Sequence, residues 1–250
     1  MTNAAPDAVA LEQSGETATL WLNRPERGNA LGPDIVDGLD AGIDAALAAG
    51  ARLIVLRGRG RNFCTGLDLG DLEAMSDGDL ALRILRIELL LQKISGLPVS
   101  TVSVAGGRVF GAGADLFAVC DHRLAMPGAS FVFPGPAFGL VLGTARLAGL
   151  VGDGLARRLL LSGIAIDTKQ AATIGLATAM PAEEDVPALL EQARQAAIRL
   201  DAPTVTALHG RTRAIDDAGD LAALARSVAR PGLKDRIMAY RAQARPAPKP

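Results

Sequence analysis

The sequence predicts an α/β core followed by a mostly helical C-terminal part. In roughly the first half of the chain, β-like runs and helical patterns alternate, which is typical of central strands covered by helices. From Thr144 onward helical patterns dominate. We therefore expect residues 1–200 to form the α/β core and residues 201–250 to form a helical subdomain suited to oligomerisation.

The first predicted elements are a hairpin and a helix. Two β-like runs, residues 8–13 and 17–23, are separated by Gly15, a pattern typical of a hairpin. A helix begins at Pro33 and ends at Gly50, because its apolar residues recur every four positions between these two signals.

The next elements continue the alternation. The compact apolar run at residues 53–56 predicts a buried strand, and residues 77–94 predict a long amphipathic helix. A strand at residues 99–105 leads through a glycine-rich link to a buried helix at residues 114–119. A further strand follows at residues 123–126.

The C-terminal half is predicted to be helical. Helical patterns cover residues 155–161, 168–174, 186–200, 204–208, 221–228 and 234–240. The Pro-rich tail at residues 245–250 is expected to be disordered.

Composition excludes several classes of protein. The 26 Lys and Arg residues nearly balance the 27 Asp and Glu residues, so the broad electrostatic attraction on which nucleic-acid and membrane-surface binding depend is missing. Two Cys and two His residues are too few and too scattered for a structural metal site. No apolar stretch is long enough to span a membrane, and no leader pattern is seen, so we expect a cytoplasmic protein.

Glycines follow the predicted strand at residues 99–105. Backbone N–H groups at such a turn can approach an anion or an oxygen that becomes negative during a reaction. A dinucleotide fingerprint would need a glycine where Leu116 stands, so a nicotinamide cofactor is not indicated. A second loop, residues 62–69, follows the strand at 53–56 and could direct another N–H group to the same cleft. Two such donors are the geometry of an oxyanion hole.

Several motifs in order give the chain a family resemblance. They are residues 22–31, 63–69, 106–121 and 155–163, with Ala171 and Gly175-Leu176 beyond. With these motifs the chain, over roughly residues 17–245, resembles the enoyl-CoA hydratase/isomerase (crotonase) family. The resemblance implies a spiral of ββα units, a homotrimer or dimer of trimers, and acyl-CoA thioesters as ligands. It implies no cofactor beyond the coenzyme A of the substrate.

The resemblance also implies site residues. The oxyanion donors would be the backbone N–H groups of Leu67 and Ala112. Contacts to the acyl-CoA would come from Arg24, Arg27, Ala30, Leu31, Leu67, Asp68, Leu69, Gly70, Phe110, Gly111, Ala112, Phe133 and Gly135. Arg24 and Arg27 could equally be solvated surface residues, and Asp68 reads better as a loop or helix-cap residue.

This sequence departs from the family pattern at the positions of the two catalytic glutamates. The first position falls on Asp115, which keeps a carboxylate with one methylene less reach. The second falls on Gly135, between two prolines, where no carboxylate is available. Two hypotheses follow: an enzyme of the hydratase or isomerase type with Asp115 as its acid/base, or a non-catalytic protein that binds fatty acyl-CoA.

Other reactive residue types are expected to be structural. Cys64 and Cys120 fit buried apolar positions, and Asp121 and His122 fit a helix-to-strand turn. The only tyrosine, Tyr240, is a candidate for completing the site from the C-terminal helices, as are the arginines between residues 226 and 245.

Overall fold

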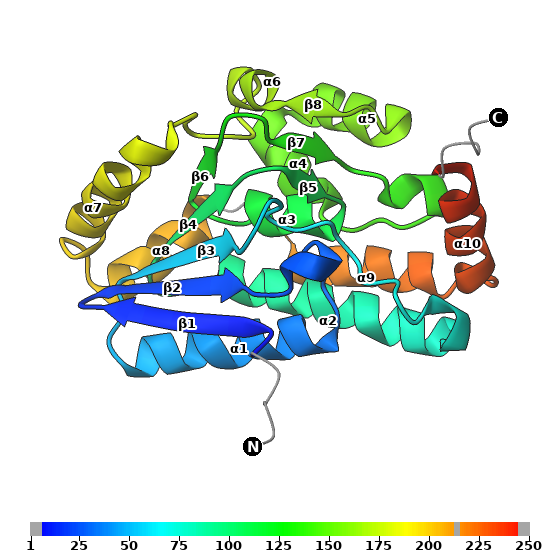
Figure 1. Cartoon of the computed structure of the whole chain (residues 1–250), viewed down its shortest axis with the longest axis horizontal. Coiled ribbons are helices and arrows are strands. Elements are labelled where there is room, and N and C mark those ends of the chain that lie inside the picture. Colours follow the sequence, from blue (N-terminus) through cyan, green and yellow to red (C-terminus); the bar gives the residue numbers. More distant parts are fainter. Residues whose placement is uncertain (1–6, 213–215, 245–250) are drawn as a thin grey trace.

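The computed structural model describes residues 7–212 and 216–244 of the 250-residue chain. The tail predicted to be disordered and nearly all of the N-terminal segment inspected for a leader lie outside these ranges. Figure 1 shows two β-sheets with helices packed around them, and helix α3 near the centre of the molecule.

The larger sheet has the strand order β1-β2-β3-β4-β6. Its strands are β1 (Val9–Ser14), β2 (Thr17–Leu22), β3 (Leu53–Gly58), β4 (Ser100–Ala105) and β6 (His122–Ala125). β1 and β2 pair antiparallel as the expected hairpin, and every later strand joins in parallel. All five strands lie where the sequence predicts them, to within one or two residues.

Helices α1 (Pro33–Ala48) and α2 (Asp77–Ser95) lie side by side along the molecule (Figure 1). The predicted apolar face of α1 is confirmed, because its Ile35, Leu39 and Ile43 are fully buried. Ser76 begins α2, since its hydroxyl accepts a hydrogen bond from the N–H of Asp79 while the Asp79 carboxylate accepts one from the N–H of Ser76.

The smaller sheet was not predicted. It consists of β5 (Arg108–Phe110), β7 (Ser130–Val132) and β8 (Ile166–Asp167), each too short to produce an alternating pattern in the sequence. Helix α3 (Ala112–Ala118) begins directly after β5 and two residues before its predicted start. It packs against both β4 and β5, and so joins the two sheets.

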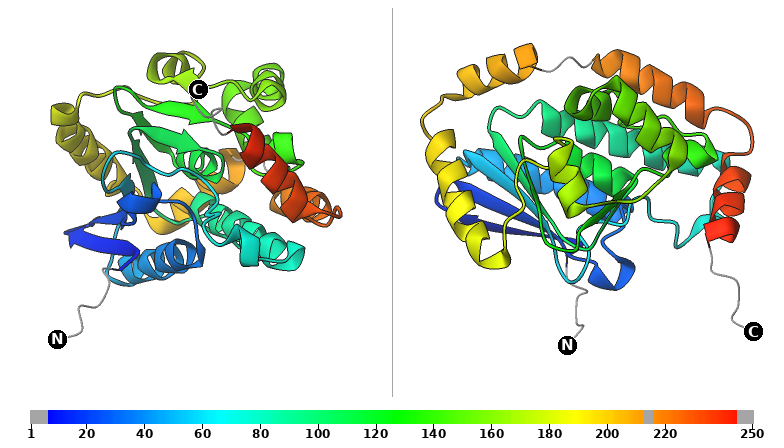
Figure 2. Two further views of the ribbon diagram at one scale, coloured as in Figure 1. Left: turned by 45° about the vertical axis from the view of Figure 1, so that its right-hand side comes forward. Right: turned by 90° about the horizontal axis from the view of Figure 1, so that it is seen from above.

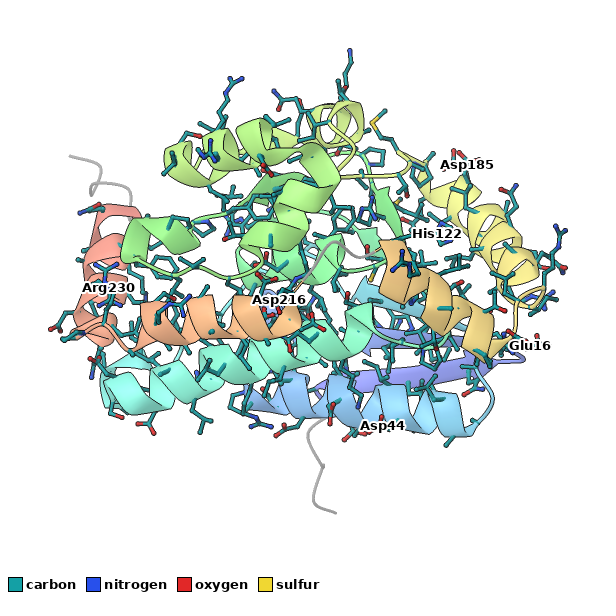
Figure 3. The ribbon with its side chains drawn as sticks, turned by 180° about the vertical axis from the view of Figure 1, so that it is seen from behind. Glu16, Asp44, His122, Asp185, Asp216 and Arg230 are labelled. Carbon is teal, nitrogen blue, oxygen red and sulfur yellow. The ribbon has the colours of Figure 1, made fainter. Side chains whose placement is uncertain are left out.

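The remaining helices form the C-terminal half. They are α4 (Thr144–Val151), α5 (Asp153–Ser162), α6 (Thr168–Thr173), α7 (Val186–Ala197), α8 (Ala202–Thr212), α9 (Asp217–Val228) and α10 (Leu233–Ala244). α7 and α10 lie at opposite ends of the molecule in both Figure 1 and the right-hand view of Figure 2. Seen from behind, α9 runs along α2 (Figure 3), where Leu224 packs in one cluster with Leu80 and Ile84.

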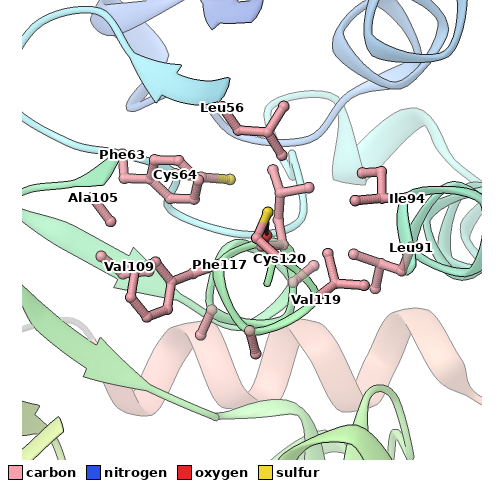
Figure 4. Packing of buried hydrophobic residues seen from close by; sticks show 14 of the residues in the cluster. Leu56, Phe63, Cys64, Leu91, Ile94, Ala105, Val109, Phe117, Val119 and Cys120 are labelled. Atoms are coloured by element: carbon pink, nitrogen blue, oxygen red, sulfur yellow. Dashed lines mark hydrogen bonds between the residues drawn. The ribbon is translucent and has the colours of Figure 1, made fainter. Parts of the chain in front are cut away.

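The centre of the core surrounds α3. Phe117 packs edge-on against Phe63 and at 4.9 Å, ring centroid to ring centroid, against Phe131. Figure 4 shows Cys64 and Cys120 within this apolar cluster. Burial raises the pKa of both thiols to about 12, so they are protonated at neutral pH and behave as small apolar side chains, as expected.

Candidate active site

A cavity of about 220 Å³ lies at the N-terminal end of α3. It is lined by Thr65, Gly66, Leu67, Leu69, Ile84, Ile87, Phe110, Gly111, Ala112, Asp115, Phe133, Pro134, Gly135, Pro136, Phe138, Leu140, Leu142, Leu160 and Tyr240. We call it the first cavity. Most of its wall is apolar, and polar side chains enter it from Thr65, Asp115 and Tyr240.

The segment before Leu67 is fixed by hydrogen bonds to its neighbours. The N–H of Phe110 donates to the carbonyl of Cys64 over 3.0 Å, and the N–H of Leu31 donates to the carbonyl of Gly66 over 2.7 Å. Gly66 adopts φ +93°, and a Cβ atom there would meet the Phe110 carbonyl at 2.7 Å, so only glycine fits. Within the described ranges the N–H of Leu67 has no hydrogen-bond partner.

The second amide lies at the start of α3. Gly111 adopts φ +53° and donates its N–H to the carbonyl of Val132 over 2.8 Å, which turns the chain from β5 into the helix. A Cβ atom on Gly66 would lie 3.6 Å from the nitrogen of Ala112, so the two loops touch at this point. The N–H of Ala112 likewise has no partner among the residues that the structure describes. Two unpaired N–H donors beside one cavity can stabilise an oxygen that becomes negative.

Asp115, in the first turn of α3, is the only carboxylate side chain in the described lining of the first cavity. Its residue is 6% exposed, and no described residue donates a hydrogen bond to it. Burial raises the pKa of Asp115 to about 7, although the nearby Arg146 lowers it. A carboxyl group with such a pKa can both accept and donate a proton near neutral pH.

A glycine makes room for the Asp115 carboxylate. Gly143, which immediately precedes α4, has φ +63°, and a Cβ atom at this position would overlap the Asp115 carboxylate. The absence of a side chain at Gly143 therefore leaves the space that the Asp115 carboxylate occupies.

A buried ion pair beside Asp115 was missed by the sequence reasoning. Glu88 of α2 accepts hydrogen bonds from both terminal nitrogens of Arg146 on α4, and the two side chains are 1% and 4% exposed. Gln92 also donates to Glu88, over 2.8 Å. A signal was present, because Glu88 stands on the apolar face of α2 between Ile84 and Leu91, at helical spacing.

Gly135 also lines the first cavity, in a short 3₁₀ helix over Gly135–Phe138. It contributes backbone only, as the sequence predicts. The C-terminal helix closes this side, because Tyr240 of α10 packs on Phe138 with ring centroids 5.1 Å apart. Phe110, Gly111 and Phe133, which are among the expected acyl-CoA contacts, also line the first cavity.

The residues at 24–31 and 67–70 that the family resemblance implies as acyl-CoA contacts divide into two groups. Leu67 and Leu69 line the first cavity. The others do not: Arg24, Arg27, Ala30, Leu31, Asp68 and Gly70. Leu31 is fully buried and Ala30 nearly so.

The carboxylate of Asp68 has both charged and backbone partners. Its carboxylate lies 3.2 Å from Arg27 and 3.6 Å from Arg24, and it accepts the N–H of Gly70 over 2.9 Å. A side chain on Gly70 would overlap the Arg27 guanidinium. The two arginines are thus held beside the 67–70 loop, with 40% of the Arg27 side chain exposed.

Residues 7–212 and 216–244 contain no cluster of three or more His, Cys, Asp or Glu side chains that could hold a metal ion. Within the same ranges, no helix has the length and apolar character needed to cross a membrane.

Comparison with known proteins identifies the family. The sequence profile described as enoyl-CoA hydratase/isomerase matches residues 12–229. A probable enoyl-CoA hydratase, echA6, of Mycobacterium bovis is 37% identical over 173 residues, covering 68% of this chain and 69% of the relative. A putative enoyl-CoA hydratase of Thermus thermophilus is 30% identical over 243 residues, covering 91% and 95%.

Solved structures agree with this assignment. A putative enoyl-CoA hydratase/isomerase from Bordetella parapertussis superposes with a TM-score of 0.91 at 46% identity, covering 95% of this chain and 99% of that one. The M. tuberculosis protein titled probable enoyl-CoA hydratase EchA3, at 22% identity and a TM-score of 0.78, shares the fold over 95% and 98% of the two chains. The fold is therefore the predicted crotonase fold, and the chain belongs to the enoyl-CoA hydratase/isomerase family.

Proposed function

We propose that this protein transfers a proton at the carbon next to an acyl-CoA thioester, as an enoyl-CoA isomerase does. One observation carries the proposal: two unpaired backbone N–H groups and one buried carboxyl group with a pKa of about 7 line the same apolar cavity. The thioester oxygen lies between the N–H groups of Leu67 and Ala112, and the acyl chain occupies the apolar wall.

The reaction needs one proton carrier. With a 3-enoyl thioester bound, the ionised carboxylate of Asp115 takes a proton from C2. The electron pair of the broken C–H bond delocalises onto the thioester oxygen, where the two N–H groups stabilise the negative charge. Asp115 then returns the proton to C4, which leaves a 2-enoyl thioester and restores the carboxylate.

Isomerisation suits the site better than hydration does. Adding water to a double bond calls for one group to activate the water and a second to deliver the proton, a division of roles that two carboxyl groups provide. Asp115 stands alone in the described lining, and Gly135 offers no side chain. A single carboxyl group is enough for a proton shuttle.

The apolar wall and Gly135 also favour a second candidate function, a non-catalytic protein that binds fatty acyl-CoA. Both candidates place the coenzyme A outside the first cavity, beside residues 24–31 and 67–70, where Arg24 and Arg27 can meet its phosphates. The family's trimeric assembly and a cytoplasmic location are parts of the same proposal.

The two candidates differ in whether an enolate forms. We would incubate butanoyl-CoA with the protein in D₂O and follow deuterium incorporation at the α-carbon by NMR. Alongside, conversion of a 3-enoyl-CoA to the 2-enoyl-CoA would be followed by absorbance. For an active enzyme, we expect Asp115→Asn to lower both rates by ~10²–10⁴-fold, because it removes the base.

A matched control is Asp121→Asn, which changes the same residue type beyond the other end of α3, outside the first cavity. Equal exchange rates in wild type and Asp115→Asn would remove Asp115 from the mechanism. If calorimetry detects butanoyl-CoA binding while wild type catalyses neither reaction, the non-catalytic candidate replaces the enzyme.

A further inference from the structure

A second cavity lies directly behind the first. Its volume is about 710 Å³, and it shares Pro136, Leu140 and Leu160 with the lining of the first cavity. The two spaces are therefore separated by these side chains. We call this space the second cavity.

The second cavity combines an apolar interior with charged edges. Its apolar lining comes largely from α4 and α5 and from the loop before α4, and includes Leu140, Val141, Ala145, Ala148 and Ala156. Four charged residues also line it: Asp153, Arg157 and Arg230 are exposed, and Asp220 is half-buried. Such a space is suited to a flexible hydrocarbon chain rather than to a polar or highly charged group.

Among the described residues, Leu160 and Pro136 are the two that line the first cavity, the second cavity and a smaller third cavity of about 180 Å³, which Ala137 also lines. Of the two, Leu160 of α5 has the flexible side chain, and it is half-buried. A leucine can change rotamer without leaving a hydrogen bond unsatisfied. An acyl chain whose thioester oxygen is bound by the two N–H groups, and which fills the first cavity, therefore meets the Leu160 side chain. A rotamer change of this side chain would connect the first cavity with the second.

We propose that the second cavity holds the distal methylene groups of long fatty acyl thioesters. Leu160 divides the two cavities and so determines whether an acyl chain extends beyond the first. The inference rests on the proposed function, because it takes the acyl group to be anchored in the first cavity. It adds the substrate class: the protein binds long-chain acyl-CoA more tightly than chains that end inside the first cavity.

The test fills the second cavity and leaves the first unchanged. Ala148 lines the second cavity but not the first, so Ala148→Phe places a ring where the distal methylenes would lie. Binding of butanoyl-CoA and hexadecanoyl-CoA would be measured by calorimetry. We expect Ala148→Phe to weaken hexadecanoyl-CoA binding at least about tenfold, since excluding even two methylenes has this effect, and to leave butanoyl-CoA binding unchanged.

Ala137→Phe is the matched control, because the same substitution then fills the third cavity instead. Hexadecanoyl-CoA affinity should not change in this variant. A loss in Ala137→Phe but not in Ala148→Phe would assign the chain to the third cavity and overturn the proposal. Equal hexadecanoyl-CoA affinity in all three proteins would also overturn it.

A second variant guards against poor folding of the first. Val141 is 42% exposed and lines the second cavity alone, so Val141→Trp narrows that space from its rim and should give the same selective loss. The outcome for butanoyl-CoA separates the two proposals. If wild type binds neither thioester, acyl-CoA binding itself fails, whereas normal butanoyl-CoA binding with no effect of either variant on hexadecanoyl-CoA rejects only the second cavity.

Discussion

Helix α3 has an aspartate close to each of its ends, and the two carboxyl groups have opposite surroundings. Asp115 lies in the first turn, faces the first cavity and receives no hydrogen bond from any described residue. Asp121 lies just beyond the last turn, accepts hydrogen bonds from the N–H and hydroxyl of Thr101, and lies 3.1 Å from Nε2 of His209.

The pKa values follow these surroundings. Burial raises the pKa of Asp115 to about 7. Burial also acts to raise the pKa of Asp121, but the hydrogen bonds from His209 and Thr101 outweigh it and lower the pKa below the ordinary value. The carboxyl group of Asp115, at one end of this short helix, is thus available for proton transfer. That of Asp121, at the other end, binds His209 of α8 and holds this helix against the core. The partners of each group, rather than its residue type, decide its role.

The largest expected effect is on the free energy of unfolding and concerns Asp115, at the end of α3 that faces the first cavity. The folded state holds a proton on Asp115 up to about pH 7, whereas the unfolded chain releases it near pH 3.8, so wild type loses stability as pH rises through this window. Asp115→Asn cannot ionise and should exceed wild type in unfolding free energy by up to ~4 kcal/mol at pH 8. Urea unfolding at several pH values would show this gap closing toward pH 4, and parallel pH profiles would contradict the burial argument.

The next effect concerns activity. Because the proposed mechanism uses the ionised form of Asp115 as the base, kcat/KM for α-proton exchange should rise about tenfold per pH unit well below pH 7 and level off above it. The predicted change between pH 5 and pH 7 is about 50-fold, because Asp115 is half ionised at pH 7 and about 1% ionised at pH 5. The Asp121→Asn variant should keep the same profile, since its change lies beyond the far end of α3. A profile that is flat in this range would mean that another group takes the proton.

The smallest effect concerns the Asp121 end. Asp121→Asn should lower the unfolding free energy by about 2 kcal/mol near neutral pH, because it weakens hydrogen bonds to a charged group. A lowered pKa stabilises the folded state above the unfolded value of 3.8, so this loss should shrink on acidification. Thermal unfolding at pH 7 and at about pH 2 tests the sign, which is opposite to that of Asp115→Asn.

Much of the fold could be predicted because its signals are local. The four-residue spacing of Ile35, Leu39 and Ile43 predicts α1, and apolar runs bounded by glycines predict the strands of the larger sheet. β5, β7 and β8 could not be predicted, because strands of two or three residues are defined by their partners rather than by their own sequence.

The site shows the same division. Glycines mark the loops of Leu67 and Ala112, since only glycine allows the close approach at Gly66 and the positive φ at Gly111. The surroundings of Asp115 depend on Glu88 and Arg146, which are 58 residues apart in the sequence and meet only in the fold. Tyr240 likewise reaches the first cavity through the packing of α10, which no local pattern reveals.

Gly143 and Arg146 occupy the N-cap and the first turn of the same helix, α4. The glycine provides the steric space for the Asp115 carboxylate, and the arginine provides the positive charge that opposes the effect of burial on its pKa. A small shift of α4 along its axis would therefore change the position and the acidity of the acid together. No residue of α4 lines the first cavity, so moving this one helix could retune the chemistry of the cavity with no substitution in its lining.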